Sequence, residues 1–141
     1  MGDISSPQPA MLLVAAFSRY GEALDWGRER SIAQFGPLIL ESPRFEFCET
    51  EYYTPSMGPG WLKTFGACER LVAPSALVES KRQTNGWETE YAGTAKHGES
   101  RPLNLDPCYI GLGKLVLAST KDHAHRIYLG QGIYAEVTLY Y

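Results

Sequence analysis

The clearest pattern in the sequence is the stretch HRIYLGQGIYAEVTLYY, residues 125–141. Two runs of strand-forming residues flank Gly130-Gln131-Gly132, which is typical of a β-hairpin. In the second run, apolar residues two positions apart are expected to share one face of a strand: Ile133, Ala135, Val137, Leu139 and Tyr141. The hairpin predicts a sheet in which neighbouring strands run antiparallel.

Upstream of this hairpin, apolar runs and turn residues predict further strands and two helices. The expected strands are residues 11–17, 38–42, 61–67 and 114–119, with a short extended segment at 102–107. The expected helices are residues 22–35, which Gly36-Pro37 ends, and 74–84, which Asn85-Gly86 ends. Residues 88–101 are polar and predict a surface loop.

This order of elements predicts an α+β fold, with a mixed or antiparallel sheet that carries two helices on one face. The expected topology is a ferredoxin-like βαββαβ core to which the C-terminal β-hairpin is added. A chain of 141 residues has the length of one domain. We therefore expect residues 1–10 to form a disordered tail and residues 11–141 to form a single α+β domain.

The composition argues against several classes of protein. With 44% hydrophobic and 21% charged residues, the chain does not have the profile of a disordered protein. No apolar run approaches the ~18 residues of a membrane span, so no membrane partner is expected. The net charge of −3 makes bulk electrostatic binding to nucleic acid unexpected as well.

The number and spacing of the cysteines indicate the cellular compartment. The chain has an odd number of cysteines, and no two of them form a Cys-x-x-Cys pair: they are Cys48, Cys68 and Cys108. A disulfide framework needs an even number, and a zinc site needs paired spacing. Together with the lack of a secretory pattern at the N-terminus, three reduced thiols predict a cytoplasmic protein.

The densest group of polar side chains is residues 119–126, which lie between two expected strands. Such loops often carry function because a rigid scaffold holds their side chains in place. Lys121 and Arg126 have the chemistry to bind a carboxylate or phosphate. His125 has the chemistry to move a proton near neutral pH. The other interpretation is a solvated turn whose polar groups satisfy one another.

Other patterns give weaker signals. His123 and His125 have the spacing of metal ligands in an extended segment, but such pairs arise by chance and no metal is predicted. Residues 111–115 resemble a phosphate loop but lack the Ser or Thr after Lys114, so a P-loop nucleotidase is not expected. Acidic and aromatic side chains at residues 46–53 could line a pocket or form the two faces of one strand.

Five longer motifs resemble one known family. They are Met57-Gly58-Pro59-Gly60, Asn104-Leu105-Asp106-Pro107 followed by Tyr109, and residues 114–122, 125–130 and 132–139. Over these motifs the chain resembles the bacterial and archaeal family called domain of unknown function 4416, from about residue 11 onwards. The resemblance implies no established activity. Some members carry a GTP-binding label, which the incomplete phosphate loop does not support.

The resemblance strengthens seven site candidates, all of which lie in these motifs. They are His125, Asp106 and Asp122 as catalytic residues, and Arg126, Lys121, Asn104 and Glu136 as ligand-binding residues. The family usually has an aromatic residue at the position of His123 and a capping aspartate at the position of Ala73, and this chain departs from both. Members also continue into an aromatic and proline-containing tail, which implies that this chain, ending at Tyr141, lacks a family segment.

Two functions are open at this stage. The first is binding of an anionic small molecule, a nucleotide or a phosphorylated metabolite, with His125 and Asp106 or Asp122 as an acid/base pair; no cofactor is identified. The second is a non-catalytic protein-binding or assembly module, with a protein partner or a homo-oligomer, in which the same residues are structural. If these residues converge on an open pocket the first is favoured, and if they are buried and mutually satisfied the second is.

Overall fold

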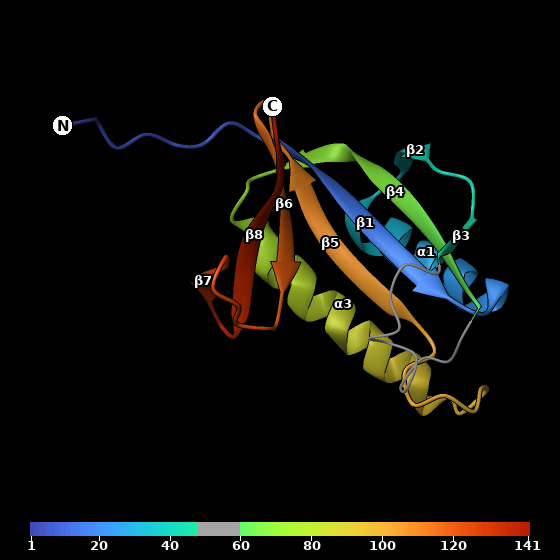
Figure 1. Cartoon of the computed structure of the whole chain (residues 1–141). Coiled ribbons are helices and arrows are strands. Elements are labelled where there is room, and N and C mark those ends of the chain that lie inside the picture. Colours follow the sequence, from blue (N-terminus) through green and yellow to red (C-terminus); the bar gives the residue numbers. More distant parts are fainter. Residues whose placement is uncertain (48–59) are drawn as a thin grey trace.

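The computed structural model describes residues 1–47 and 60–141 and shows one antiparallel sheet with two helices (Figure 1). The elements of these ranges, in chain order, are β1 (Ala10–Ser18), α1 (Gly21–Phe35), β2 (Leu38–Glu41), β3 (Phe45–Phe47), β4 (Trp61–Val72), α3 (Ala76–Gly93), β5 (Asn104–Ile110), β6 (Lys114–Ser119), β7 (Ile127–Gly130) and β8 (Ile133–Tyr140). The strand order in the sheet is β2-β4-β1-β5-β6-β8-β7, and β3 pairs with β4.

Both helices cover the same face of the sheet. One buried cluster joins Val14 and Ala16 of β1 to Leu24 of α1 and to Trp87 and Tyr91 of α3. Residues two apart on a strand point to the same face, so β1 directs this pair of side chains at both helices. The predicted α+β class, with two helices on one face, is therefore confirmed.

The predicted ferredoxin-like core stays a prediction. The elements β1, α1, β2, β4, α3 and β5 follow a βαββαβ order along the chain, and their strands lie in the order β2-β4-β1-β5. However, β2 has only four residues, and β3 is an additional strand beside it on β4.

Helix α3 is longer than the sequence predicted. It continues through Asn85-Gly86 to Gly93, so the predicted end of the helix and the predicted loop at 88–93 are wrong. The reason is tertiary, because Trp87 and Tyr91 are buried against the sheet in the last turns. A helix-interior glycine costs about 1 kcal/mol relative to alanine, and burying two aromatic side chains outweighs this cost.

The C-terminal hairpin is present, but its second strand does not keep one apolar face. Ile133 is buried and Ala135 packs beside it against the cluster formed with Leu77 of α3. Beyond Ala135, Val137 and Leu139 are 50% and 58% exposed, so the predicted shared face ends at Ala135. A register shift in the pairing of β6 with β8 follows between Val137 and Leu139.

The feature that creates a site is the divergence of β5 from β6. The two strands pair only over Cys108–Ile110 and Leu115–Leu117, next to the tight turn at residues 111–113. Residues 104–107 of β5 therefore have no partner on β6, and α3 is visible between the strands in Figure 1. The segment that resembled a phosphate loop is this strand-to-strand turn.

Three features named in the sequence analysis lie outside the described residues. They are Cys48, most of the acidic and aromatic run 46–53, and the motif Met57-Gly58-Pro59.

Candidate functional site at the divergence of β5 and β6

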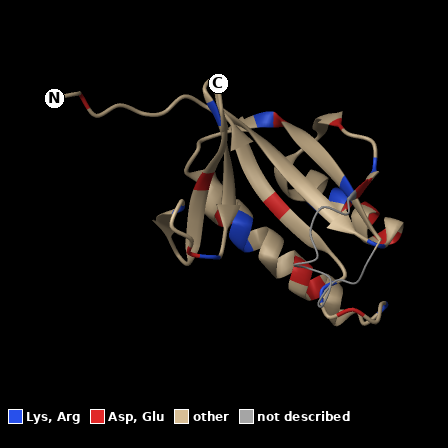
Figure 2. Cartoon of the chain, in the orientation of Figure 1, with Lys and Arg blue, Asp and Glu red and all other residues tan. Residues whose placement is uncertain are grey.

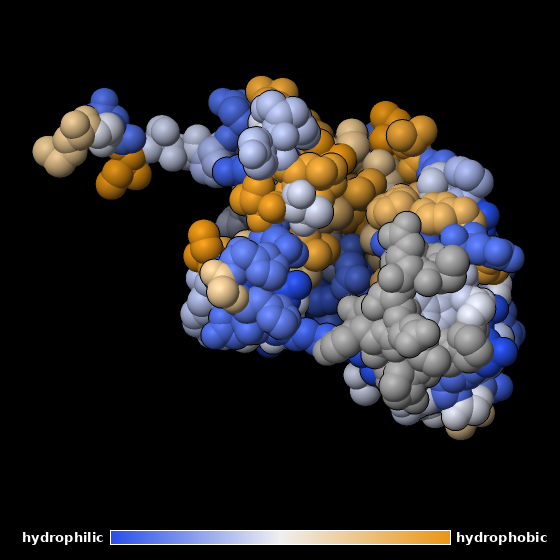
Figure 3. All heavy atoms as spheres, viewed as in Figure 1, coloured by the Kyte–Doolittle hydropathy of each residue, from blue (hydrophilic) through white to orange (hydrophobic). Residues whose placement is uncertain are grey.

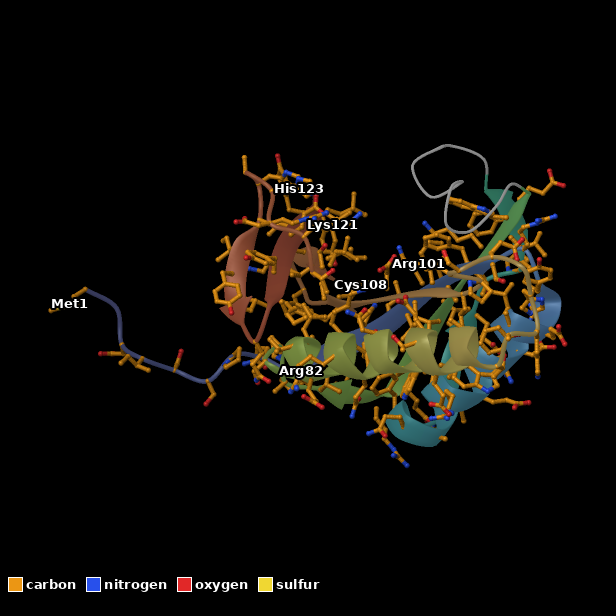
Figure 4. All side chains as sticks on the ribbon, turned by 90° about the horizontal axis from the view of Figure 1, so that it is seen from below. Met1, Arg82, Arg101, Cys108, Lys121 and His123 are labelled. Atoms are coloured by element: carbon orange, nitrogen blue, oxygen red, sulfur yellow. The ribbon has the colours of Figure 1, made fainter. Side chains whose placement is uncertain are left out.

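A cleft of about 470 Å³ lies where β5 and β6 separate. One wall comes from α3, the segment before β5 and β5 itself, and the other from the end of β6 and the turn to β7. The side chains lining it are Lys81, Asn85, Arg101, Asn104, Asp106, Leu117, Ala118, Ser119, Thr120, Lys121, His123 and Arg126. Figure 3 shows hydrophilic residues in the hollow, and Figure 4 shows Lys121 and His123 across it from Arg101.

Lys81 reaches the cleft from α3. Its ammonium lies 3.0 Å from Oδ1 of Asp106 and 3.3 Å from the carbonyl oxygen of Leu105, and its side chain is only 7% exposed. The carboxylate and the carbonyl oxygen supply hydrogen-bond partners for this buried ammonium. The pair therefore holds the Lys81 ammonium in a fixed position beside the cleft.

Asn104 links two charged groups on the same wall. Nη2 of Arg101 donates to its Oδ1 at 3.0 Å, and its Nδ2 donates to Oδ2 of Asp106 at 2.7 Å. These bonds use both polar ends of the amide. The chain Arg101–Asn104–Asp106–Lys81 is thus one connected network, which holds its members in fixed orientations.

Glu88 of α3 lies behind this network. Its Oε1 accepts a hydrogen bond from the backbone N–H of Leu105 at 2.6 Å, and its Oε2 lies 3.8 Å from Nη2 of Arg101. Burial raises the pKa of Glu88 to about 7, although Lys81 opposes the shift. Near neutral pH this carboxyl group is therefore only partly ionised, which leaves more of the positive charge of Arg101 and Lys81 uncompensated.

The opposite wall is organised by Arg126. Its Nη1 donates to the hydroxyl of Ser119 and to the carbonyl oxygen of Lys121, both at 3.0 Å. The Ser119 hydroxyl also accepts from the backbone N–H of Lys121 at 3.2 Å. The Arg126 side chain is 13% exposed, and its buried Nε has no hydrogen-bond partner among the described residues. Arg126 therefore shapes the turn as well as lining the cleft.

The structure brings together four of the seven predicted site residues. Asn104, Asp106, Lys121 and Arg126 line the cleft. The other three, His125, Glu136 and Asp122, are not part of the lining.

The three remaining candidates have other surroundings. His125 is 59% exposed, and its Nε2 lies 2.7 Å from Oε1 of Glu136. The other oxygen of Glu136 lies 3.6 Å from Nη2 of Arg126. Asp122 is exposed in the turn. The lining thus contains Asp106 but neither His125 nor Asp122, so the two halves of the predicted acid/base pair do not meet in it.

Sequence reasoning missed the contribution of α3 and of the segment before β5. The sequence did contain a signal for Lys81, because this residue lies on the same face of α3 as the buried residues Leu77, Thr84 and Trp87. A charged residue on a buried face needs a partner, so its presence predicts a polar group opposite it. Arg101 carried no such signal, since it lies in a polar segment whose path depends on tertiary contacts.

The charge of the lining is unbalanced. Lys81, Arg101, Lys121 and Arg126 supply four cations, and Asp106 supplies the one carboxylate among the described lining residues. Carboxylates outside the lining offset part of this charge, because Glu136 lies 3.6 Å from Arg126 and Glu88 lies 3.8 Å from Arg101. An anion bound in the hollow would relieve the repulsion that remains between the positive groups.

Two further groups bear on the chemistry that the described residues can perform. Cys108 is buried, and its burial raises the pKa of the thiol to about 12, so it is protonated at neutral pH. The rings of His123 and His125 stack with their centroids 5.9 Å apart. Within residues 1–47 and 60–141, no three His, Cys, Asp or Glu side chains form a group able to hold a metal ion.

In these same ranges, neither α1 nor α3 combines the length and hydropathy that a bilayer crossing requires.

Comparison with curated proteins and with solved structures gave no match. Comparison with family models matched one, described as "Domain of unknown function (DUF4416)", over residues 8–141. This match covers nearly the whole chain, including both walls of the cleft, and the chain therefore belongs to the DUF4416 family.

Proposed function

We propose that the protein binds an anionic small molecule, a nucleotide or a phosphorylated metabolite, in the cleft between β5 and β6. The observation that carries this proposal is the excess of four cationic side chains over one carboxylate in its described lining. The volume of about 470 Å³ is within the range of roughly 300–1,000 Å³ typical of small-molecule sites.

The two walls would act on the ligand in different ways. Lys81 and Arg101 are held by Asp106 and Asn104, so they present charge at fixed positions without reorganising. Lys121 would contact the ligand from the opposite wall, in the turn between β6 and β7. A phosphate group gains most from such a site, because it accepts several charge-assisted hydrogen bonds at once.

The proposed role is binding. The cytoplasmic location that the cysteines predict is part of the same proposal. Proton transfer by His125 is not part of the proposal, because its exposed ring pairs with Glu136 outside the lining. Asp106, which does line the cleft, is engaged by Lys81 and Asn104.

The test is a thermal-shift screen followed by calorimetric titration, with inorganic phosphate, pyrophosphate, a sugar phosphate and nucleoside mono- and triphosphates as probes. A probe at about a hundred times its Kd should stabilise the fold by roughly 2.7 kcal/mol, which raises the Tm by several degrees. Arg101→Gln and Lys121→Gln, one from each wall, should weaken binding roughly tenfold or more each.

Arg82→Gln is the matched control. Arg82 follows Lys81 on α3, is exposed and lies away from the cleft (Figure 4). It should bind the probes like the wild type. If no anion shifts the Tm, or if all three variants lose binding to the same extent, the cleft is not the site.

A second candidate function is the assembly module, and one observation favours it. Large apolar side chains are exposed together along the C-terminal hairpin: Ile127, Tyr128, Leu129, Val137, Leu139, Tyr140 and Tyr141. Strand β7 pairs with β8 only as far as Ala135. Beyond this point the outer edge of β8 has no strand partner among the described residues, and such an edge is a template for pairing with another chain.

Light scattering over a range of protein concentrations tests this second function. Self-association that Leu139→Lys abolishes would favour it. A monomer at every concentration, with an unchanged Leu139→Lys variant, would count against pairing between copies.

A further inference from the structure

A second cavity, of about 320 Å³, lies between α1 and strands β1, β2 and β4. It shares no lining residue with the cleft between β5 and β6. Its volume is also within the range of small-molecule sites, and its lining changes from apolar at one end to charged at the other.

The inner end of the cavity is apolar. Val14, Leu24 and Leu105 line it, and all three are buried. Gly27 of α1 and Gly66 of β4 lie in its walls, and each already packs closely against a leucine. Their lack of side chains lets the backbones approach while the space beside them stays open.

The outer end carries two ion pairs, both of which bridge α1 and the β2–β3 segment. Arg28 pairs with Glu41 through two hydrogen bonds, of 2.5 and 3.0 Å, and Arg44 pairs with Asp25. All four side chains line the cavity and are between 36% and 61% exposed. Figure 2 shows basic and acidic residues interspersed over this part of the molecule.

The charges at this mouth are balanced, with two guanidinium groups and two carboxylates. A ligand with net charge gains little from a balanced mouth, because attraction to one pair member is offset by repulsion from the other. A ligand with one anionic and one cationic group can replace one ion pair of the mouth by two new ones. Its anionic group pairs with Arg28 in place of Glu41, and its cationic group pairs with the Glu41 carboxylate that is released. Exposed ion pairs are worth only about 0–1 kcal/mol, so this exchange meets little resistance.

Hydroxyl groups line the wall between the two ends. Ser42 Oγ accepts from the backbone N–H of Phe65 at 2.8 Å and lies 3.3 Å from Oγ1 of Thr64. The Ser31 hydroxyl donates to the carbonyl oxygen of Gly27 at 2.8 Å. Their remaining lone pairs can accept hydrogen bonds from an ammonium group.

We propose that this cavity binds a small zwitterion with an apolar body, of the class of apolar α-amino acids. The carboxylate would contact Arg28 or Arg44, the ammonium would contact Glu41 or Asp25, and the side chain would lie against Val14, Leu24 and Leu105. This site stands on residues separate from the cleft and does not depend on the function proposed there.

The test is calorimetric titration of the full chain with L-leucine and three analogues. Leucinamide lacks the carboxylate, 4-methylpentanoate lacks the ammonium, and glycine lacks the apolar body. Leucine should bind, and each analogue should bind roughly tenfold more weakly or worse, because each loses one of the three contacts. Arg28→Gln should weaken leucine binding to a similar extent, whereas Arg82→Gln should not.

The proposal is overturned if leucine does not bind, or if 4-methylpentanoate or leucinamide binds as tightly as leucine. Glu41→Gln is a second variant with an exposed side chain, and it should weaken leucine more than 4-methylpentanoate. Equal weakening of both compounds would show that the acidic groups do not contact the ammonium. Phosphate binding in the cleft should be unchanged in Arg28→Gln, so the two sites can fail separately.

Discussion

The ammonium of Lys81 lies 3.0 Å from the Asp106 carboxylate, although the two residues belong to α3 and β5. Asp106 pairs across the sheet with Ala15, and Leu105 beside it packs in the core under the helices. The contact is possible because β5 has no partner on β6 at this position, which opens a path from the helix to the cleft. This one ion pair connects the helix layer to the proposed anion site.

Removing one member of this pair should destabilise the fold more than removing both. Asp106→Asn leaves a buried ammonium without its carboxylate and should cost about 2 kcal/mol, less than the ~3–5 kcal/mol of fully buried pairs. Lys81→Met/Asp106→Asn should be clearly more stable than the sum of the single variants predicts. Urea denaturation of the four proteins measures this coupling. Additive effects would show that the two charges do not interact.

Glu88 should make stability fall as the pH rises. Burial raises its folded pKa from 4.5 to about 7, so between these values the folded state binds more protons than the unfolded chain. Stability is then lost over this window, by at most about 3 kcal/mol. Glu88→Gln should remove this slope and be more stable than the wild type at pH 8.

Urea denaturation at pH 5 and pH 8 measures the effect of Glu88. The control is Glu90→Gln, an exposed residue of the same helix that pairs with Arg30, which should keep the slope of the wild type. A Glu88→Gln variant with an unchanged slope would mean that Glu88 is ionised throughout this window.

The glycines of the two helices should respond differently to alanine. Gly86 is exposed inside α3, and a Cβ there meets nothing within 4 Å, so Gly86→Ala should stabilise the fold by about 1 kcal/mol. In Gly27→Ala the new Cβ would lie 3.2 Å from Cδ2 of Leu105, and this crowding should cancel the gain. The Tm of each variant, measured by calorimetry, gives the comparison. If Gly27→Ala stabilised the fold as much as Gly86→Ala, the side chains beside Gly27 would be able to move aside at little cost.

Arg126 and His125 should differ in their effect on stability. Arg126→Ala removes two hydrogen bonds from a mostly buried guanidinium and should cost about 2 kcal/mol. His125→Ala removes an exposed pair with Glu136 and should change stability by less than about 1 kcal/mol. Chemical denaturation of the two variants gives the comparison. The reverse order would make the His125–Glu136 contact, and not Arg126, the support of the turn.

The sequence was a good guide wherever the pattern was local. The strand at 11–17 and the helix at 22–35 correspond to β1 and α1, and the hairpin corresponds to β7 and β8. Each depends on side chains within a few residues of one another, so periodicity and turn residues suffice to predict it. The end of α3 was mispredicted because the turn signal at Gly86 is local, whereas the burial of Trp87 and Tyr91 is not.

The candidate site divides in the same way. Lys121 and Arg126 were predicted from one polar turn, and Asn104 and Asp106 from a motif at one strand. Spacing alone could not tell that His125 points to Glu136 and not into the cleft. The turn between β6 and β7 is irregular, so neither a strand nor a helix period fixes which side its residues face.

The sequence by itself determined the α+β class, the family and the positive charge of the β6–β7 turn, because periodicity, motif order and residue type are properties of neighbours along the chain. Only the tertiary structure decided that β5 and β6 separate after three residue pairs and that Lys81 and Arg101 join the turn across the gap. These groups are far apart in sequence. Their meeting depends on the register of the sheet and on the packing of α3 against it, which arise from many long-range contacts acting together.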